Sequence, residues 1–406
     1  MRLYQINSVL NYGSTGRIVE QIGLTVQVAG WQCRVGHGSK FPRPSELSHF
    51  VAGGQGDVLR HEAQSLLLDR MGLASRHATR RLVADIEAFR PDIVHLHNLH
   101  NYYLNYPLLT SYLASTGIPI VWTLHDCWPF TGHCCYFDAT GCTRWQTGCG
   151  DCPCPHGDYP RLLLPAHSRR NYRLKRAAFE PLAGRMTLVP VSDWLASYLK
   201  NSFLKEASVR VIHNGVDLQT FSPRDPAALR TRLGLDGKKV ALGVALPWIP
   251  RKGLRDMMEL AASLPADEWR VILVGLSQKQ LAALPSGILG VERTSDVDEL
   301  ARYYSLADVY VTTSYEDNFP TTNLEALACG TPVVTYATGG CPEAIDAATG
   351  MVVPQGDIAA LAAAVRSVDK AAMTAACRER AVRHFDRDQC FGAYLHLYES
   401  LLSERP

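Results

Sequence analysis

The sequence lacks the features that mark membrane-spanning, nucleic-acid-binding or secreted proteins. No stretch of about 18 residues is continuously apolar, as a membrane-spanning helix requires. The 41 Lys and Arg residues nearly balance the 39 Asp and Glu residues, and the net charge of +2 argues against a dedicated nucleic-acid binder. The N-terminal segment turns polar after one early arginine instead of continuing as a signal peptide. We therefore expect a cytoplasmic protein.

What the chain does have is enough length and apolar content for two packed domains. At 406 residues, with 47% apolar and 20% charged residues, it is typical of a folded globular protein. Runs rich in β-formers alternate with segments of helical periodicity, which predicts parallel, doubly wound α/β sheets. A polar, proline-containing segment places the domain boundary near residue 218. The expected strands lie at 1–9, 92–97, 119–125, 188–192, 209–216, 239–246, 269–275, 308–314 and 332–337.

The segment 314–343 says most about function. It places a short helix between two apolar strands, with Pro320 at the helix start and Gly330 at its end. A helix N-terminus suits a diphosphate, because its unpaired N–H groups carry partial positive charge. Asp317 lies before the helix and Glu325 about one turn into it, so their carboxylates could accept hydrogen bonds from sugar and ribose hydroxyls. The alternative is an ordinary crossover with a helix cap and a surface carboxylate.

Asp317 and Glu325, with seven residues between them, resemble the E-x7-E signature of the retaining family 4 glycosyltransferases, which have the GT-B fold. The neighbouring EALACGTPVV and GGCPE resemble that family's donor-site strand and loop. The resemblance implies that Glu325 binds the nucleotide ribose and that Asp317, an Asp where the family has Glu, touches the transferred sugar. Glu316 precedes Asp317, so the sequence leaves open which carboxylate reaches the sugar. The other donor-binding residues expected in this segment are Asn318, Phe319, Thr321 and Thr322.

The same resemblance predicts the architecture, in which two doubly wound Rossmann-like domains face a central cleft. Residues 1–218 would form an N-terminal acceptor-binding domain with a cysteine-rich insertion at 127–154. Residues 219–385 would form the C-terminal domain that binds the nucleotide-sugar donor. A helix in 386–406 would cross back to the N-terminal domain.

Two further segments resemble parts of the family's donor site. Lys252 precedes a glycine as in the family's Lys-Gly pair, and its cation would stabilise the charge that gathers on the leaving diphosphate. Pro247 stands where the family has an arginine, and we expect Arg251 to substitute for it. Gly13 and Gly16 resemble the glycine-rich loop that lines the cleft. The alternative for this loop is a purely steric role in a tight turn from strand to helix.

Histidines gather at the expected ends of two first-domain strands, where doubly wound sheets place their ligands. His125 resembles the family's active-site histidine, which contacts the donor sugar. Asp126 could orient His125 or take the acceptor proton, and a purely structural histidine is the alternative. His95 and His97 face the same side of one strand, yet no third ligand lies near them in the sequence. We therefore do not expect a metal site there.

The segment 167–180 is predicted to be a basic helix in the acceptor-binding domain. Such a helix would suit peripheral contact with an anionic membrane that carries a lipid-linked acceptor. A solvated, charged helix explains the pattern equally well. The basic residues are Arg169, Arg170, Arg173, Lys175 and Arg176.

Seven of the 12 cysteines fall within 127–154. Cys149 and Cys152 form a C-x2-C pair, the spacing that binds one side of a tetrahedral zinc ion. Cys142 and one of the cysteines at 134–135 could supply the other side. Nearby groups leave the ligand set ambiguous, namely Cys127, Cys154, His133 and His156. A reducing cytoplasm favours four thiolates over two disulfides, which are the alternative. The sequence predicts one structural zinc held by Cys134, Cys142, Cys149 and Cys152.

Together these features predict a retaining glycosyltransferase that moves a sugar from a UDP- or GDP-sugar to a lipid-linked or growing bacterial surface glycan. Nothing resembles the Asp-x-Asp metal clamp of the other main glycosyltransferase fold, so we expect no catalytic metal. The family is thought to attack from the leaving-group face, with the departing phosphate helping to accept the proton. Two alternatives are a nucleotide-sugar epimerase of the same fold and a zinc-containing interaction protein without enzymatic activity.

Overall fold

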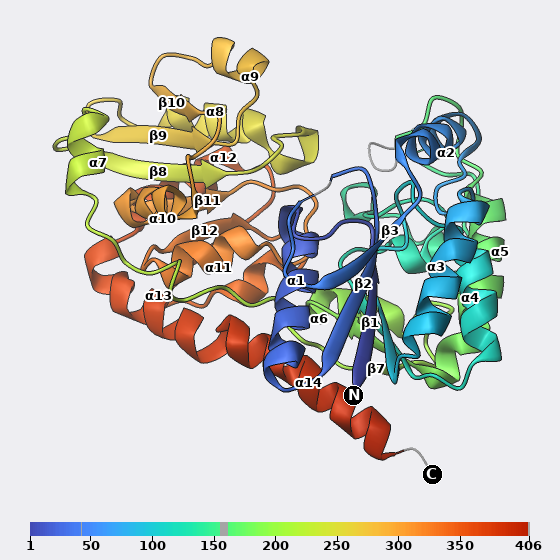
Figure 1. The fold of residues 1–406 in the computed structure, drawn as a ribbon. Coiled ribbons are helices and arrows are strands. Elements are labelled where there is room, and N and C mark those ends of the chain that lie inside the picture. The colour runs from blue at the N-terminus through green and yellow to red at the C-terminus, as the bar shows by residue number, and fades with distance from the viewer. Residues whose placement is uncertain (42, 155–160, 405–406) are drawn as a thin grey trace. The chain divides into compact units, whose positions relative to one another are not determined.

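The computed structural model describes residues 1–41, 43–154 and 161–404, which divide into two compact units. Unit 1 comprises Met1–His213 and the C-terminal residues from Phe391 onward, and unit 2 comprises Asn214–Cys390. Each unit is an α/β domain around one parallel sheet, as the alternation of strands and helices predicts (Figure 1). Among the described residues, no helix has the length and apolar character needed to cross a membrane.

Unit 1 is built on a seven-stranded sheet in the order β3-β2-β1-β4-β5-β6-β7, with every pair parallel. The order reverses between β1 and β4, and doubly wound sheets bind ligands at such a switch point. The strands are β1 (Arg2–Asn7), β2 (Gln32–Gly38), β3 (Ser48–Ala52), β4 (Ile93–Leu96), β5 (Ile120–Leu124), β6 (Met186–Pro190) and β7 (Ser208–Val209). The helices are α1 (Gly13–Val28), α2 (Gln55–Leu68), α3 (Arg76–Phe89), α4 (Tyr106–Ser115), α5 (Ser168–Phe179) and α6 (Asp193–Leu199).

Alternation along the strands gives the sheet of unit 1 an apolar face and a polar face. Val94 and Leu96 belong to the apolar core that also contains side chains of α3, α4 and α5. His95 and Gln5 point the other way, where Gln5 Nε2 donates to a backbone carbonyl of α1 at 3.0 Å. The last helix, α14 (Arg387–Ser403), packs on this face, with the Tyr398 hydroxyl 2.7 Å from His95 Nδ1. Buried polar groups require partners, so this polar face specifies where the helix docks.

Unit 2 repeats the same topology with six parallel strands in the order β10-β9-β8-β11-β12-β13. Its switch point lies between β8 and β11. Helices α8 and α12 contact each other, and α11 contacts both α10 and α13 (Figure 1). The strands are β8 (Lys239–Val244), β9 (Trp269–Val274), β10 (Ile288–Val291), β11 (Val309–Thr312), β12 (Val333–Tyr336) and β13 (Gly350–Val353). The helices are α7 (Ala227–Arg232), α8 (Leu254–Ser263), α9 (Gln278–Ala282), α10 (Val297–Leu306), α11 (Thr321–Ala328), α12 (Ile358–Ser367) and α13 (Lys370–His384).

The chain passes from one unit to the other twice, after His213 and after Cys390. Within unit 2, the segments next to these two points are hydrogen-bonded to each other. Val216 N donates to the carbonyl of Phe385 at 2.8 Å, and Arg387 N donates to the carbonyl of Val216 at 3.1 Å. Because of this bridge, unit 2 begins about five residues before the expected boundary at 218 and ends about five residues after 385. The C-terminal part of α14 belongs to unit 1.

The expected strand at 209–216 is wrong, because regular pairing ends with β7 at Val209. Arg210 and Ile212 still donate to carbonyls of β6, at 3.0 and 3.3 Å. The segment therefore runs along β6 without forming a full ladder. Its apolar alternation reflects this contact, which the sequence does not distinguish from a strand.

Candidate active site

A cavity lies at the switch point of unit 2, where β8 and β11 end beside each other. Its walls come from the ends of these two strands and from the loops that follow them. Parallel strands present their carboxyl ends at one edge, which brings together residues that are distant in the sequence. The lining residues are Val244, Ala245, Trp248, Lys252, Tyr310, Val311, Thr312, Thr313, Ser314, Asp317 and Thr322.

Lys252 and Asp317 form an ion pair in this cavity, with Lys252 Nζ 2.5 Å from Asp317 Oδ2. Burial raises the pKa of Asp317, but the cations of Lys252 and Arg251 more than offset this effect and hold the pKa below its usual value. Asp317 is therefore ionised at neutral pH. The cavity thus contains one fixed cation and one fixed carboxylate, which suits a ligand with both phosphates and hydroxyls.

Two glycines let the loops approach closely enough to form this pair. Gly253 has φ +69°, and a Cβ there would lie 2.1 Å from the carbonyl oxygen of Thr313. Thr313 Oγ1 in turn donates to the carbonyl of Lys252 at 3.1 Å. Gly339 has φ +52°, and a Cβ there would lie 1.9 Å from the carbonyl oxygen of Asp317. Only glycine fits both positions, so the backbone itself fixes Lys252 and Asp317.

Arg251 and Glu316 contribute to the same loop, chiefly through the backbone. Arg251 NH1 donates to the carbonyl of Glu316 at 2.7 Å, and Tyr315 N donates to the carbonyl of Arg251 at 2.7 Å. Glu316 is half-buried, whereas Asp317 is buried and lines the cavity. Of the two neighbouring carboxylates, Asp317 is the one that the structure places beside Lys252.

Helix α11 starts and ends as the sequence predicts, with Pro320 as its N-cap and Gly330 at φ +76° just after it. Glu325 lies in its second turn and is buried, and the hydroxyl of Tyr304 donates to Glu325 Oε2 at 2.8 Å. Within the described part of the chain, the cavity lining includes Thr322 of this helix but not Glu325. Glu325 therefore lies farther into α11 than Thr322, outside the lining of the cavity that contains the Lys252–Asp317 pair.

Asn318 and Phe319 hold the loop before α11 in place. The carbonyl of Asn318 accepts a hydrogen bond from Gly340 N at 2.8 Å. The carbonyl of Phe319 accepts one from Asn214 Nδ2 at 2.9 Å. Thr321, the first residue of α11, is half-buried. A direct donor contact by any of these three side chains stays a prediction.

In unit 1, the histidines form a buried chain of hydrogen bonds at the ends of β4 and β5. His97 Nδ1 lies 3.2 Å from His125 Nε2, and His97 Nε2 lies 3.1 Å from Gln5 Oε1. His95 is paired at both ring nitrogens, with Thr123 Oγ1 at 2.8 Å and the hydroxyl of Tyr398 at 2.7 Å. Every ring nitrogen of His95 and His97 is thus within hydrogen-bonding distance of a protein partner.

Burial also fixes the protonation state of these histidines. It lowers the pKa of His125 to about 4, with Asp126 opposing the shift, and it lowers the pKa of His95 and His97 well below the usual value. All three imidazoles are neutral at pH 7. His125 can therefore donate or accept a hydrogen bond, but it does not supply a positive charge.

Asp126 is hydrogen-bonded to two groups besides any interaction with His125, and its two expected roles stay predictions. Its Oδ2 lies 2.9 Å from His100 Nε2, and its Oδ1 accepts a hydrogen bond from Trp128 N at 2.9 Å. Burial raises the pKa of Asp126, but His100 and these hydrogen bonds lower it below the usual value. This pairing could not be predicted from local patterns, because His100 and Asp126 lie 26 positions apart and follow different strands.

Gly13 and Gly16 lie in the turn between β1 and α1. Gly13 opens the helix at φ +62°, and a Cβ on Gly16 would lie 3.1 Å from Val9 Cγ2. Asn11 N also donates to the carbonyl of Gly16 at 3.1 Å. The positive φ of Gly13 and the close contacts of Gly16 each explain why a glycine stands at that position of the turn. Contact of either glycine with a ligand stays a prediction.

The basic helix predicted at 167–180 is α5, but its faces differ from a simple amphipathic pattern. Arg169, Arg173 and Arg176 are exposed, whereas Lys175 is completely buried. Lys175 Nζ donates to the carbonyl of Trp128 at 2.5 Å and lies 3.5 Å from the centre of that ring. Burial lowers the pKa of Lys175 to about 7. Lys175 therefore belongs to the core of unit 1 and not to its basic surface.

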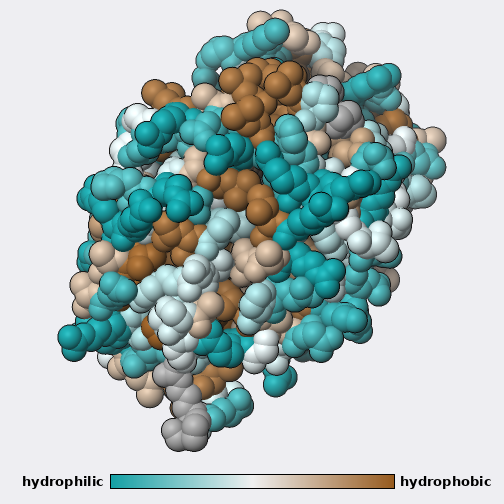
Figure 2. All heavy atoms as spheres, turned by 90° about the vertical axis from the view of Figure 1, so that its right-hand side faces the viewer, coloured by the Kyte–Doolittle hydropathy of each residue, from teal (hydrophilic) through white to brown (hydrophobic). Residues whose placement is uncertain are grey.

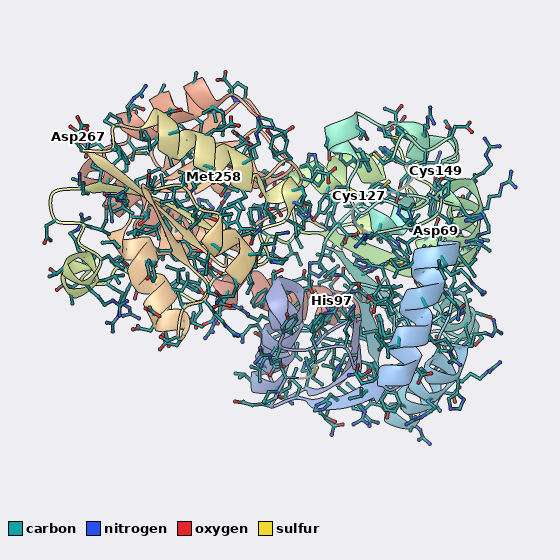
Figure 3. The ribbon with its side chains drawn as sticks, turned by 90° about the horizontal axis from the view of Figure 1, so that it is seen from above. Asp69, His97, Cys127, Cys149, Met258 and Asp267 are labelled. Atoms are coloured by element: carbon teal, nitrogen blue, oxygen red, sulfur yellow. The ribbon has the colours of Figure 1, made fainter. Side chains whose placement is uncertain are left out.

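The cysteine-rich segment connects β5 to α5, and Figure 3 shows Cys127 and Cys149 in this part of unit 1. Asp69, at the end of α2, anchors the segment: its Oδ1 lies 2.8 Å from His133 Nδ1, and its Oδ2 accepts a hydrogen bond from His167 N at 2.8 Å. No disulfide bond joins any two of the described cysteines. His156, one of the nearby groups considered as a ligand, lies outside the described residues.

Sequence reasoning missed several residues that line the cavity of unit 2. Trp248, Thr313 and Ser314 lie at or just after the ends of β8 and β11. Their positions at strand ends around the switch point are the signal that could have identified them. The Trp248 side chain is fixed by a hydrogen bond from Nε1 to the carbonyl of Val274 at 2.9 Å.

Two Rossmann-like units with this strand order define the GT-B fold, and solved structures agree. Sucrose-phosphate synthase from Thermosynechococcus elongatus aligns over 100% of both chains with a TM-score of 0.74 and 19% identity. Anabaena HepE in complex with UDP-glucose aligns over 98% of this chain and 100% of its own, with a TM-score of 0.67 and 16% identity. At these identities the likeness establishes the fold alone.

Sequence comparison identifies the family. Residues 29–220 match the model for Glycosyltransferase Family 4, and residues 238–369 match the model for Glycosyl transferases group 1. The chain therefore belongs to the GT-B glycosyltransferases of the family 4 type.

Two relatives match part of the chain. D-inositol 3-phosphate glycosyltransferase of Mycobacterium sp. (strain JLS) is 36% identical over 163 residues, which is 37% of each chain. WcaC of Escherichia coli K12, described as a colanic acid biosynthesis glycosyl transferase, is 28% identical over 284 residues, 66% of this chain and 65% of that protein. The chain thus spans between about a third and about two thirds of the length of these relatives.

Proposed function

We propose that this chain is a retaining glycosyltransferase that transfers a sugar from a UDP- or GDP-sugar to a lipid-linked or growing bacterial surface glycan. The observation that carries the proposal is the pair of Lys252 and Asp317 in the cavity at the switch point of unit 2. Family membership supports sugar transfer. The Escherichia coli relative is named for colanic acid biosynthesis, and HepE was solved with UDP-glucose, which supports the glycan and the nucleotide-sugar donor.

The ion pair suggests how donor binding and catalysis are coupled. When a diphosphate enters the cavity, Lys252 exchanges its contact with Asp317 for the phosphate oxygens. The carboxylate of Asp317 then accepts hydrogen bonds from the hydroxyls of the transferred sugar. Because negative charge grows on the diphosphate as the glycosidic bond breaks, Lys252 stabilises the transition state more than the ground state.

Glu325 and His125 would complete the binding of donor and acceptor. Tyr304 fixes Oε2 of Glu325 and so orients the carboxylate for ribose hydroxyls. Neutral His125 offers a hydrogen bond to a sugar hydroxyl without adding charge. The departing phosphate takes the proton of the acceptor hydroxyl on the leaving-group face. Asp126 remains bound to His100, and no divalent metal takes part in this mechanism.

The surface around α5 favours a peripheral contact with an anionic membrane. The exposed arginines of α5 lie beside exposed leucines at the end of α2, since Arg170 NH2 donates to the carbonyl of Leu68 at 2.9 Å. Leu163 N donates to the carbonyl of Leu66 at 2.9 Å, which adds further exposed leucines to the same area. The face drawn in Figure 2 shows apolar side chains gathered beside hydrophilic ones. The exposed leucines are Leu67, Leu68, Leu163 and Leu164.

A panel of nucleotide sugars incubated with the purified protein tests the proposal. We expect one UDP- or GDP-sugar to be hydrolysed or transferred, with retention of the anomeric configuration in the product, and with no effect of EDTA on the rate. An epimerised donor in the absence of acceptor would indicate the epimerase instead. Turnover of no donor in the panel, with or without membrane extract as acceptor, would contradict the proposal.

A further inference from the structure

The segment between β5 and α5 is irregular, although several of its side chains are well buried. Within 127–154 the described regular elements are three single turns of 3-10 helix, at Trp128–Phe130, Asp138–Thr140 and Arg144–Gln146. A long segment without regular elements needs another source of order. One source is an aromatic cluster, in which the ring centres of Phe137 and Trp145 lie 5.2 Å apart.

The second source is a cavity lined by four of the cysteines, Cys134, Cys142, Cys149 and Cys152. Cys134 and Cys152 are joined by a hydrogen bond between their side chains. Cys149 interacts electrostatically with both Cys142 and Cys152. Each of the four thiols therefore has another of the four as a neighbour. Cys127 and Cys135 are completely buried and do not belong to this lining.

The backbone around Cys149 and Cys152 has the form of a tight turn that presents both sulfurs to the cavity. Cys149, Gly150 and Asp151 have φ values of +46°, +146° and +44°, a conformation that non-glycine residues rarely adopt. Gly132 N also donates a hydrogen bond to Cys149 Sγ at 3.2 Å. This hydrogen bond helps to hold Cys149 Sγ at the cavity that it lines.

Basic side chains lie near the cavity. The buried amine of Lys175 interacts with Cys149 and Cys135, and Arg144 interacts with Cys152. The guanidinium of Arg169 lies so close to the turn that a Cβ on Gly150 would be 2.8 Å from it. Four thiolates around a divalent ion carry a net charge of −2, and these basic side chains would offset part of it, although Arg169 also pairs with Asp151 at 3.6 Å.

We propose that Cys134, Cys142, Cys149 and Cys152 bind one structural zinc ion that stabilises this segment of unit 1. Four thiolates match the ligand preference and the closed, four-coordinate geometry of structural zinc sites. Binding would draw the four sulfurs onto one ion at about 2.3 Å each. The site is independent of the proposed transferase activity.

A different group in unit 1 has ligand atoms that already lie close together. His100, Asp126 and Cys135 place ligand atoms within 4.8 Å of one another. Both oxygens of Asp126 are already bonded, to His100 and to Trp128 N. This group thus forms a satisfied hydrogen-bond cluster, and we assign no metal to it.

Zinc would also position residues near His125. Cys127, the residue after Asp126, donates a backbone hydrogen bond to the carbonyl of Cys135 at 2.8 Å. Trp128 N, next in the chain, bonds to Asp126. Ordering of Cys134 by the metal would therefore reach the end of β5 through one backbone hydrogen bond and one bond to the Asp126 carboxylate.

Metal analysis of the full-length protein, purified under reducing conditions with zinc present, tests the proposal. We expect one zinc per chain in the wild type and in Cys154→Ser, a control in the same segment but outside the cavity lining. Cys149→Ser and Cys142→Ser should each lose most of the zinc. Should these variants fail to fold, substitution of cobalt for zinc in the wild type gives a second measurement, with the intense visible absorption of a tetrahedral cobalt–thiolate centre expected.

Three results would overturn the assignment. The first is a reduced, folded wild type that contains no zinc and binds no cobalt. The second is thiol counting that finds these four cysteines oxidised, which would indicate two disulfides. The third is a Cys154→Ser variant that loses the metal while Cys142→Ser or Cys149→Ser keeps it.

Discussion

At the residue scale, Lys252 and Asp317 are the two groups on which donor binding depends. They lie 65 positions apart in the sequence and meet at 2.5 Å because β8 and β11 end side by side. The sequence predicted both residues from their resemblance to family motifs. It did not predict their direct contact, since neither motif contains information about the other.

Loss of Lys252 or of the Glu325 carboxylate should weaken the donor site without unfolding unit 2. A charge-assisted hydrogen bond contributes about 1.5–3 kcal/mol, so Lys252→Ala and Glu325→Gln should each lower kcat/KM about tenfold to a hundredfold. Steady-state kinetics with the identified donor measures the effect. Arg255→Ala is the matched control, because Arg255 is exposed on α8 and pairs with Glu259. Variants of Lys252 and Glu325 as active as this control would refute their assignment.

Replacing each of the two neighbouring carboxylates in turn by its amide distinguishes which of them contacts the sugar. Asp317→Asn should reduce sugar transfer strongly while affinity for the bare nucleoside diphosphate is kept or rises, because Lys252 is then released from its ion pair. Glu316→Gln should have little effect on either quantity, since Glu316 is half-buried and absent from the cavity lining among the described residues. Transfer assays and calorimetric titration with the diphosphate measure the two quantities. The opposite pattern would mean that Glu316 reaches the sugar.

Other residues could not be placed from the sequence. Lys175 was counted among the basic surface residues, yet it is buried against Trp128. The hydrogen bond of Asp126 to His100 was likewise not predicted. In both cases the partner comes from another element, and the outcome depends on tertiary packing that local patterns do not encode.

At the scale of elements, the alternation of strands and helices was sufficient to predict the two parallel sheets. Strands buried on both faces, such as β5 and β12, stand out as short apolar runs. Four strands were missed, and three of them, β3, β10 and β13, lie at sheet edges, where exposed positions interrupt the apolar pattern. The fourth, β2, lies inside the sheet of unit 1, but its arginine and two glycines hide the apolar pattern. The order of strands within each sheet could be inferred only from the resemblance.

The turn into α8 should tolerate no side chain at Gly253. A Cβ there would lie 2.1 Å from the carbonyl of Thr313 in addition to the cost of φ +69°, so Gly253→Ala should destabilise unit 2 by more than the ~1 kcal/mol of a strained φ alone. Gly237→Ala is the control, because Gly237 has φ +72° with nothing within 4 Å. Thermal or denaturant unfolding compares the two variants. Equal losses of stability would mean that close packing against Thr313 is not required.

At the scale of the whole molecule, unit 1 should lose stability in mild acid. His95, His97 and His125 have lowered pKa values in the fold, so the unfolded chain binds more protons below the ordinary histidine pKa of 6.5. Their contribution is complete above pH 6.5 and decreases as the pH falls, by about 1.4 kcal/mol per pH unit for each histidine held neutral.

Urea unfolding at pH 7.5 and pH 5.5 measures this dependence. His396→Gln should leave it unchanged, because the side chain of His396 is exposed on α14. If the free energy of unfolding were the same at pH 7.5 and pH 5.5, protonation of the buried histidines would not destabilise the fold, which would contradict the prediction.

The central claim is that the cavity of unit 2 binds a nucleotide-sugar donor, and the most direct test is a thermal shift with nucleoside diphosphates. Ligand binding to the folded state must raise the melting temperature. We predict that UDP or GDP raises the Tm of the wild type, and that Lys252→Ala loses most of this shift while Arg255→Ala keeps it. No shift with UDP, GDP or ADP, or an equal shift in wild type and Lys252→Ala, would contradict the claim.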